Sequence, residues 1–255
     1  MSYIIIKNIK THYTLLGEKG LDVVLLPGWK QNTEMMLYIQ KFLEKNFKVY
    51  SLDWPGFGKS DLMETSYSTE DYKEFLKEFI SKLNIKNPIL IGHSFGCRIA
   101  IRYNAEGNDV YKMILTGAAG LKPKRGLEYY AKVYSYKTGK KILGLPGMKK
   151  YKDKVMKNVG SEDYKNSSGV MRDTFVKVVN EDVEPLLSKV TAETLLVFGD
   201  KDDATPLWMG KIMEEKIPNA GLAIFENQGH YAYFYEHERF NLVLEAFLKG
   251  DYNGK

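Results

Sequence analysis

A serine flanked by two glycines stands between an apolar run and a helical pattern in the first half of the chain. The apolar residues 89–91 lead directly into Gly92-His93-Ser94-Phe95-Gly96, and residues 97–103 continue as a helix. A sharp turn from strand to helix lifts a serine hydroxyl clear of a sheet, and glycines on either side avoid collisions in that turn. The hydroxyl then lies at a helix N-terminus, which favours developing negative charge. The spacing predicts Ser94 as a nucleophile, although an unreactive turn has the same residues.

A serine hydroxyl needs a base to take its proton at neutral pH, and the chain offers four histidines. His93 adjoins Ser94 in the turn, so its side chain should point away from that of the nucleophile. His12 belongs to the opening strands, and His237 to the predicted start of the last helix, where a solvated capping role is expected. His230 follows a strand and a glycine, which places it on a loop at the carboxyl edge of a sheet. We therefore predict His230 as the base.

The imidazole in turn needs a carboxylate that holds its tautomer and stabilises the imidazolium. The loop after the predicted strand 194–198 carries three candidates, Asp200, Asp202 and Asp203. Asp is also a common turn former, so two of the three have an ordinary structural explanation. The residues alone leave the choice among the three open.

The elements that must position these residues alternate along the chain as short β-rich runs and amphipathic helical stretches, a pattern typical of parallel βαβ units. We expect an opening antiparallel pair at 3–6 and 11–16, followed by strands at 23–26, 49–52, 89–91, 111–115, 194–198 and 222–225. Helical spacing covers 33–45, and Ser68 with Asp71 forms a capping box for a helix that ends near residue 83. Strand signals are missing from about 121 to 190, where several helices rich in Lys and Tyr are expected to pack over the sheet.

Five motifs in this order resemble the α/β-hydrolase family over nearly the whole chain. Residues 25–29 look like its strand and oxyanion turn, 53–60 match its D-x-P-G-x-G-x-S loop, and 91–96 match its nucleophile elbow. Residues 199–206 resemble its acid-bearing G-x-x-D-x-x-x-P loop, and Gly229-His230 falls near the end as the base does. The order Ser, Asp, His is also the one that this fold uses.

The resemblance implies a mostly parallel eight-stranded sheet flanked by helices, with a helical lid inserted after strand 6. The core domain would comprise 1–120 and 191–255, and the lid 121–190. The family pattern places the acid three residues after Gly199, which is Asp202, and draws the oxyanion hole from the backbone N–H groups of Trp29 and Phe95. One position departs from the family: Pro27 stands where a His usually precedes the glycine. The hydrogen bonds that this His would make are therefore lost, and the exact shape of the oxyanion loop stays open at this point.

The resemblance further implies a serine esterase or lipase-like hydrolase that works through an acyl-enzyme. A lid that supplies an apolar pocket with a few polar groups would suit a small or medium carboxylic ester. Aromatic residues could line that pocket, although packing within the lid or against the sheet explains them equally well. The candidates are Tyr129, Tyr130, Tyr134, Trp208 and Tyr231.

Two alternatives remain open at this point. A carbon–carbon bond hydrolase acting on a keto-dienoic acid would use the same triad, and its anionic substrate would need a guanidinium from Arg98, Arg125 or Arg172. A slow-turnover small-molecule receptor or regulatory hydrolase would also keep the triad. Nucleophilic Asp enzymes on this fold are disfavoured because Ser94 occupies the elbow.

The bulk composition excludes several other classes. No run of the 255 residues approaches the roughly 18 apolar residues of a membrane span, and nothing resembles a nucleic-acid module despite the net charge of +5. The single cysteine, Cys97, excludes an intramolecular disulfide and a multi-cysteine metal site, and we expect it to be a buried small hydrophobe. We therefore expect a cytoplasmic protein that needs neither a metal nor an organic cofactor.

Overall fold

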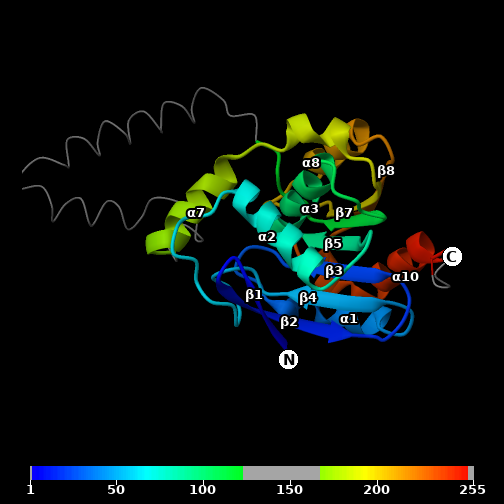
Figure 1. Ribbon diagram of the computed structural model, residues 1–255. Coiled ribbons are helices and arrows are strands. Elements are labelled where there is room, and N and C mark those ends of the chain that lie inside the picture. Colours follow the sequence, from blue (N-terminus) through cyan, green and yellow to red (C-terminus); the bar gives the residue numbers. More distant parts are fainter. Residues whose placement is uncertain (1, 123–166, 252–255) are drawn as a thin grey trace, which may run out of the picture.

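An eight-stranded sheet forms the centre of the computed structural model, which describes residues 2–122 and 167–251. The strands are β1 (Ser2–Ile6), β2 (Ile9–Leu16), β3 (Asp22–Leu26), β4 (Lys48–Leu52), β5 (Ile89–His93), β6 (Lys112–Thr116), β7 (Glu193–Gly199) and β8 (Ala220–Phe225). Their order in the sheet is β1-β2-β4-β3-β5-β6-β7-β8 (Figure 1). The pairs β1–β2 and β2–β4 are antiparallel, and all later pairs are parallel. The predicted fold class is thereby confirmed.

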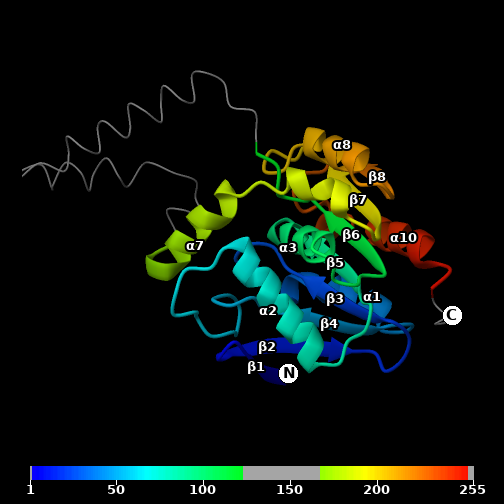
Figure 2. The same cartoon turned by 45° about the horizontal axis from the view of Figure 1, so that its top comes forward.

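Helices cover both faces of this sheet (Figures 1 and 2). One face is covered by α2 (Thr69–Lys82), α3 (Phe95–Ala105) and α8 (Leu207–Lys216). The other is covered by η1 (Thr33–Met36), α1 (Leu37–Leu43), α9 (Ala232–Tyr235) and α10 (His237–Leu248). Strand β3 shows why two layers form, because its side chains alternate between the faces. Val24 and Leu26 pack with the first set of helices, whereas Val23 and Leu25 pack with the second.

Local sequence signals explain where the helices begin. Ser68 and Asp71 form the predicted capping box at the start of α2, with each side chain bonded to the other residue's backbone N–H. The single helix expected over 33–45 is instead divided into η1 and α1. Asn32 caps η1 by accepting a hydrogen bond from the Glu34 N–H, and Met36 then leaves the helical region with φ −99° and ψ 1°. This short first segment places residues 29–35 at the carboxyl edge of the sheet.

Between β6 and β7 the described chain contributes α7 (Gly169–Asn180) and η2 (Glu184–Lys189). In both overall views α7 lies near the N-terminal end of α2 and away from the sheet (Figures 1 and 2). It is tied there by the Tyr67 N–H, which donates to the Thr174 hydroxyl at 3.0 Å, and by Lys177, which donates to the Ser66 carbonyl at 2.8 Å. The predicted lid, 121–190, is thus helical in its described C-terminal part, and 123–166 lie outside the described residues.

The chain leaves this insertion through a firmly held segment. The buried Arg98 guanidinium donates to the Glu181 carbonyl at 2.7 Å, and burial lowers the pKa of Arg98 to about 10. Arg102 lies within 3.5 Å of the Glu181 carboxylate, which also accepts from the Thr69 backbone N–H at 3.1 Å. Both α2 and α3 therefore hold the end of α7. None of the helices formed by 2–122 and 167–251 has the length and apolar character needed to cross a bilayer.

Candidate active site

Ser94 occupies a strained turn between β5 and α3. Its φ of 49° and ψ of −106° lie outside the comfortable regions for a residue with a Cβ, at a cost of roughly 1–3 kcal/mol. The turn is pinned by the Ser94 N–H, which donates to the Thr116 carbonyl at 3.0 Å. Side chains are excluded on both sides, because a Cβ on Gly96 would lie 2.0 Å from the Leu26 carbonyl oxygen and one on Gly92 would lie 2.8 Å from the Cys97 nitrogen. The glycine pattern is therefore a steric requirement of this turn.

Asp202 and His230 meet at the same edge of the sheet. The carboxylate oxygen Oδ2 of Asp202 lies 2.8 Å from Nδ1 of His230 and accepts a second bond from the Thr205 hydroxyl at 2.7 Å. The other oxygen, Oδ1, accepts the backbone N–H groups of Ala204 and Thr205, both at 2.8 Å. Four contacts thus fix the orientation of one buried carboxylate. Asp200 and Asp203 make no hydrogen bond to His230 in the described part of the chain.

These contacts also set the ionisation of Asp202. Burial by itself would raise the pKa of Asp202, but the hydrogen bonds from His230 and from the Thr205 N–H and hydroxyl outweigh it, so the pKa falls below its ordinary value. The carboxylate is therefore ionised at neutral pH and accepts a proton-bearing Nδ1. Nε2 is then the ring nitrogen of neutral His230 that can take up a proton.

A turn after β3 brings the Trp29 backbone to the same edge. The Pro27 carbonyl accepts the indole N–H of Trp54 at 2.9 Å, and the Gly28 N–H donates to Oε1 of Gln31 at 2.8 Å. The Gln31 N–H closes the turn by donating to the Gly28 carbonyl at 3.1 Å. Trp54 and Gln31 thus hold a turn that lacks the family's usual His. Gln31 did not emerge from the sequence motifs, although its position three residues after a glycine suits such a turn.

The Phe95 backbone N–H, which the sequence predicts as an oxyanion donor, directly follows Ser94. Phe95 is the first residue of α3, and first-turn N–H groups have no acceptor within their own helix. Its ring packs edge-on against the Trp29 indole with centroids 5.4 Å apart. Phe57 and Phe175 complete the surroundings of that indole at 4.9 and 5.3 Å. Trp29 is therefore fixed by contacts from the loop after β4, from α3 and from α7.

Asp53 and His12 form a buried pair that connects the segment after β3 with the loop at 53–60. Oδ1 of Asp53 accepts the Thr33 N–H at 2.7 Å, and Oδ2 accepts the Lys59 N–H at 2.8 Å. His12 lies with Nδ1 2.8 Å from the same Oδ2, and both side chains are 1% exposed. His12 therefore belongs to this structural pair, as its place in the opening strands suggested. The loop motif reflects the same packing, since a Cβ on Gly58 would lie 2.2 Å from Oδ2 of Asp53.

His93 lies directly behind His230, a contact that the sequence did not indicate. The two rings are 4.7 Å apart, and Nδ1 of His93 lies 3.2 Å from the Thr116 carbonyl oxygen. The side chain is fully buried, and burial, together with the adjacent His230, lowers the pKa of His93 to about 3. His93 is therefore a neutral support for the second ring throughout the physiological range.

The burial of neutral His93 predicts that the protein loses stability as the pH falls. The unfolded chain protonates a histidine near pH 6.5, whereas folded His93 resists protonation until about pH 3. Unfolding thus takes up a proton in this window, and the free energy of unfolding should fall by about 1 kcal/mol per pH unit between pH 6 and pH 4 because of this site alone. Urea unfolding at pH 6, 5 and 4 should give a shallower pH slope for His93→Phe or His93→Asn. The control His237→Gln should keep the wild-type slope, and parallel slopes for all four proteins would contradict the assignment.

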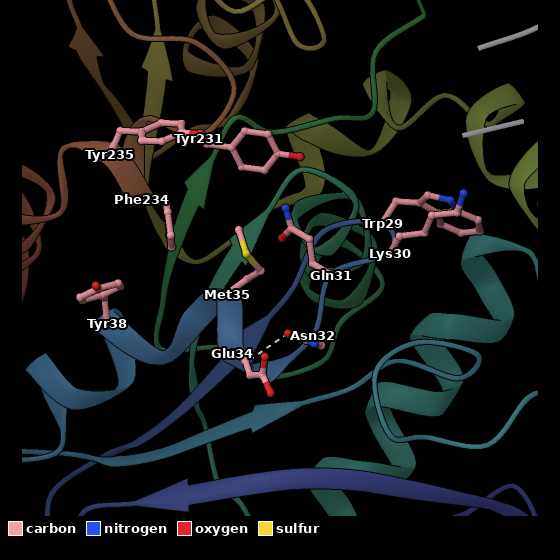
Figure 3. Close-up of a pocket in the computed structure, with 10 residues that line it drawn as sticks. All are labelled: Trp29, Lys30, Gln31, Asn32, Glu34, Met35, Tyr38, Tyr231, Phe234 and Tyr235. Atoms are coloured by element: carbon pink, nitrogen blue, oxygen red, sulfur yellow. Dashed lines mark hydrogen bonds between the residues drawn. The ribbon is translucent and has the colours of Figure 1, made fainter. Parts of the chain in front are cut away.

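A groove of about 820 Å³ opens between the segment after β3 and the segment that follows His230 (Figure 3). Its walls come from 29–38, which begins in the turn after β3, and from 231–235, which follows His230. Tyr231, one of the predicted pocket residues, lines it. Trp208 does not; it lies on α8 with 37% of its surface exposed. Tyr129, Tyr130 and Tyr134 fall in the segment outside the described residues.

Comparisons with known proteins agree with this architecture. A model of the α/β hydrolase fold family matches residues 23–237. AB hydrolase superfamily protein YisY of Bacillus subtilis is 30% identical over 268 residues, which cover 94% of this chain and 97% of that protein. A 2-hydroxy-6-oxononadienedioate/2-hydroxy-6-oxononatrienedioate hydrolase of Escherichia coli is 26% identical, covering 95% of this chain and 92% of its own length. The structure is also similar to an esterase from Exiguobacterium antarcticum, with a TM-score of 0.75, 27% identity, and coverage of 97% and 99% of the two chains. On this evidence the chain belongs to the α/β-hydrolase family.

Proposed function

We propose that this protein is a serine hydrolase that cleaves small or medium carboxylic esters, with Ser94 as nucleophile, His230 as base and Asp202 as the orienting acid. The observation that carries the proposal is the 2.8 Å contact between Asp202 and Nδ1 of His230 at the edge where the strained Ser94 turn lies. A strained elbow, an oriented imidazole and an ionised carboxylate together are the requirements of nucleophilic acyl transfer. We further propose the predicted division into a core, 1–120 and 191–255, and a lid, 121–190, and a cytoplasmic location.

The proposed reaction has two stages. Ser94 Oγ attacks the ester carbonyl carbon while Nε2 of His230 takes the hydroxyl proton, and the carbonyl oxygen becomes an oxyanion held by the N–H groups of Trp29 and Phe95. The intermediate collapses as the bond to the alcohol oxygen breaks and His230 protonates that oxygen. Water, deprotonated by His230, then attacks the acyl carbon. The bond between that carbon and Ser94 Oγ breaks, Oγ takes the proton back from His230, and the carboxylic acid leaves. Asp202 stabilises the imidazolium in both stages.

Two measurements on the wild-type protein test this reading. A fluorophosphonate probe is expected to label the protein at Ser94, as located by peptide mass spectrometry, and p-nitrophenyl acetate, butyrate and octanoate should report turnover and preferred acyl length. Cys97 is fully buried and its thiol pKa is raised by that burial, so it should stay unlabelled. Labelling at any residue other than Ser94 would refute the nucleophile, and labelling without hydrolysis of any ester would refute the esterase.

A second candidate is a carbon–carbon bond hydrolase, because the Escherichia coli relative is named for a keto-dienoic dicarboxylate substrate. The guanidinium groups that such a substrate would need are otherwise engaged among the described residues. Arg98 donates to the Glu181 carbonyl, and Nε of Arg172 donates to the Ser167 carbonyl at 2.7 Å. Arg125 lies outside the described residues. We therefore place ester hydrolysis first, and loss of absorbance of a 2-hydroxy-6-oxodienoate on addition of the protein would reverse the order.

A further inference from the structure

The groove beside the candidate active site exposes an unusual number of aromatic side chains. Tyr38 is 51% exposed, Tyr235 71% and Tyr231 38%, and all three face the same hollow with Phe234. Tyr38 packs edge-on against Phe234 with centroids 5.8 Å apart, so the two walls touch at the level of these rings. Clustered exposed apolar surface of this kind is typical of a ligand-binding site.

The groove also borders the segments that carry two of the residues we assign to the chemistry, Trp29 and His230. Trp29, whose N–H we assign to the oxyanion hole, lies at one end of it, and Tyr38 lies towards the other (Figure 3). Tyr231 forms part of the opposite wall and immediately follows His230 in the chain. The groove therefore lies between the turn that we assign to the oxyanion hole and the segment that follows His230, and His230 is the residue that we assign to protonating the departing alcohol.

Its size and lining define the chemistry that it would accept. At about 820 Å³ it lies in the upper part of the range for small-molecule sites, so a methyl or ethyl group would leave most of it filled with water. Aromatic faces suit a planar ring system, which they can contact edge-on or in offset stacks. The exposed Lys30 and Glu34 add polar groups at the rim.

From these observations we propose that the groove between 29–38 and 231–235 binds the alcohol portion of the substrate, and that this portion is a bulky aromatic alcohol. The inference rests on the proposed ester hydrolysis and deepens it. The acyl group then extends away from the groove. Tyr38 and Tyr235 are specificity-determining residues in this arrangement, since they contact the departing group without touching the reacting atoms.

Two matched ester series test the assignment. In one, the acyl group is always acetyl and the alcohol grows from ethanol to benzyl alcohol to 2-naphthylmethanol. In the other, the alcohol is always ethanol and the acid grows from acetic to phenylacetic to 2-naphthylacetic acid. In the double variant Tyr38→Ala/Tyr235→Ala, kcat/KM for 2-naphthylmethyl acetate should fall by about tenfold relative to wild type, as expected from losing two aromatic contacts. For each ester of the acyl series, kcat/KM of the same variant should fall by less than twofold. Tyr3→Ala removes a similarly exposed tyrosine (48%) from the far edge of the sheet and should affect neither series.

The results separate the failure of this inference from the failure of the proposed function. A loss that grows along the acyl series would make the groove an acyl pocket and overturn the proposal, as would a loss independent of size in both series. A binding measurement avoids dependence on turnover: calorimetry should detect 2-naphthylmethanol binding to Ser94→Ala, and about tenfold weaker binding when Tyr38 and Tyr235 are also replaced. Absence of binding would refute the groove even if the protein proves to be an esterase. Binding without any ester turnover would support an aromatic alcohol site while the esterase assignment fails.

Discussion

Ser94→Ala is expected to lower kcat for any ester that the protein hydrolyses by ~10⁵–10⁶-fold, because loss of the nucleophile leaves only binding and oxyanion stabilisation. The fold should be unaffected. The Ser94 side chain makes no capping hydrogen bond to α3, and alanine carries the same Cβ into the turn at φ 49°, so no new strain arises. Burst and steady-state release of p-nitrophenol should both disappear, while the far-UV circular dichroism and the urea midpoint stay within error of wild type.

Two variants, one at another serine and one at the cysteine, serve as controls for Ser94→Ala. Ser81→Ala changes an exposed serine near the end of α2 and should retain full activity and full fluorophosphonate labelling. Cys97→Ala removes the only thiol of the chain and should still be labelled, since the buried Cys97 takes no part in the chemistry. Turnover by Ser94→Ala at the wild-type rate would show that the elbow is structural and that the proposed mechanism is wrong.

Much of the sheet could be predicted because its signals are local. The buried strands β3, β5 and β7 are short apolar runs, and the helix start at Ser68 is encoded within four residues. The elbow motif is also local in sequence, because Gly92 and Gly96 flank Ser94 by two residues on either side, although the contact that excludes a side chain at Gly96 is with the distant Leu26 at the end of β3. At these positions the sequence motif lies within the strand, turn or helix that it specifies. The local pattern of apolar residues and glycines is therefore sufficient to predict these elements.

The supporting contacts could not be predicted because they join loops that are distant in sequence. Gln31 accepts the Gly28 N–H three residues earlier, but the neighbouring Pro27 carbonyl is held by Trp54, which comes from the loop after β4. His93 was expected merely to point away from the nucleophile; the ring that it meets, that of His230, comes from the loop after β8. The aromatic groove likewise combines a wall from 29–38 with one from 231–235. The type of a side chain indicates which chemistry it can perform. Which residue it contacts depends here on which strands end next to each other in the sheet, and that order is not local in the sequence.

The choice among three aspartates after β7 is the point where geometry adds most to the motif, and Asp202→Asn tests it. Oδ1 of Asp202 accepts two backbone N–H groups at 2.8 Å, so the amide oxygen of asparagine should occupy that position and direct its NH₂ towards Nδ1 of His230. Facing a donor, Nδ1 must lose its proton and the ring must carry it on Nε2. That tautomer cannot accept the Ser94 proton, so kcat/KM should fall by ~10⁴-fold with little change in KM.

Asp203→Asn provides the matched control, because Asp203 is adjacent and exposed and lacks a hydrogen bond to His230 among the described residues. It should keep at least half of the wild-type activity. The proton itself gives a second readout, since a downfield Nδ1–H resonance should be present in wild type and in Asp203→Asn and absent from Asp202→Asn. If Asp203→Asn were the inactive variant, the acid would be misassigned and the Asp202 contact would be structural. If all three proteins were equally active, the imidazole would need no carboxylate here, and the low pKa of Asp202 would contribute to stability alone. That contribution is present above the unfolded pKa of Asp202, near 3.9, and is lost as the pH falls through the folded pKa.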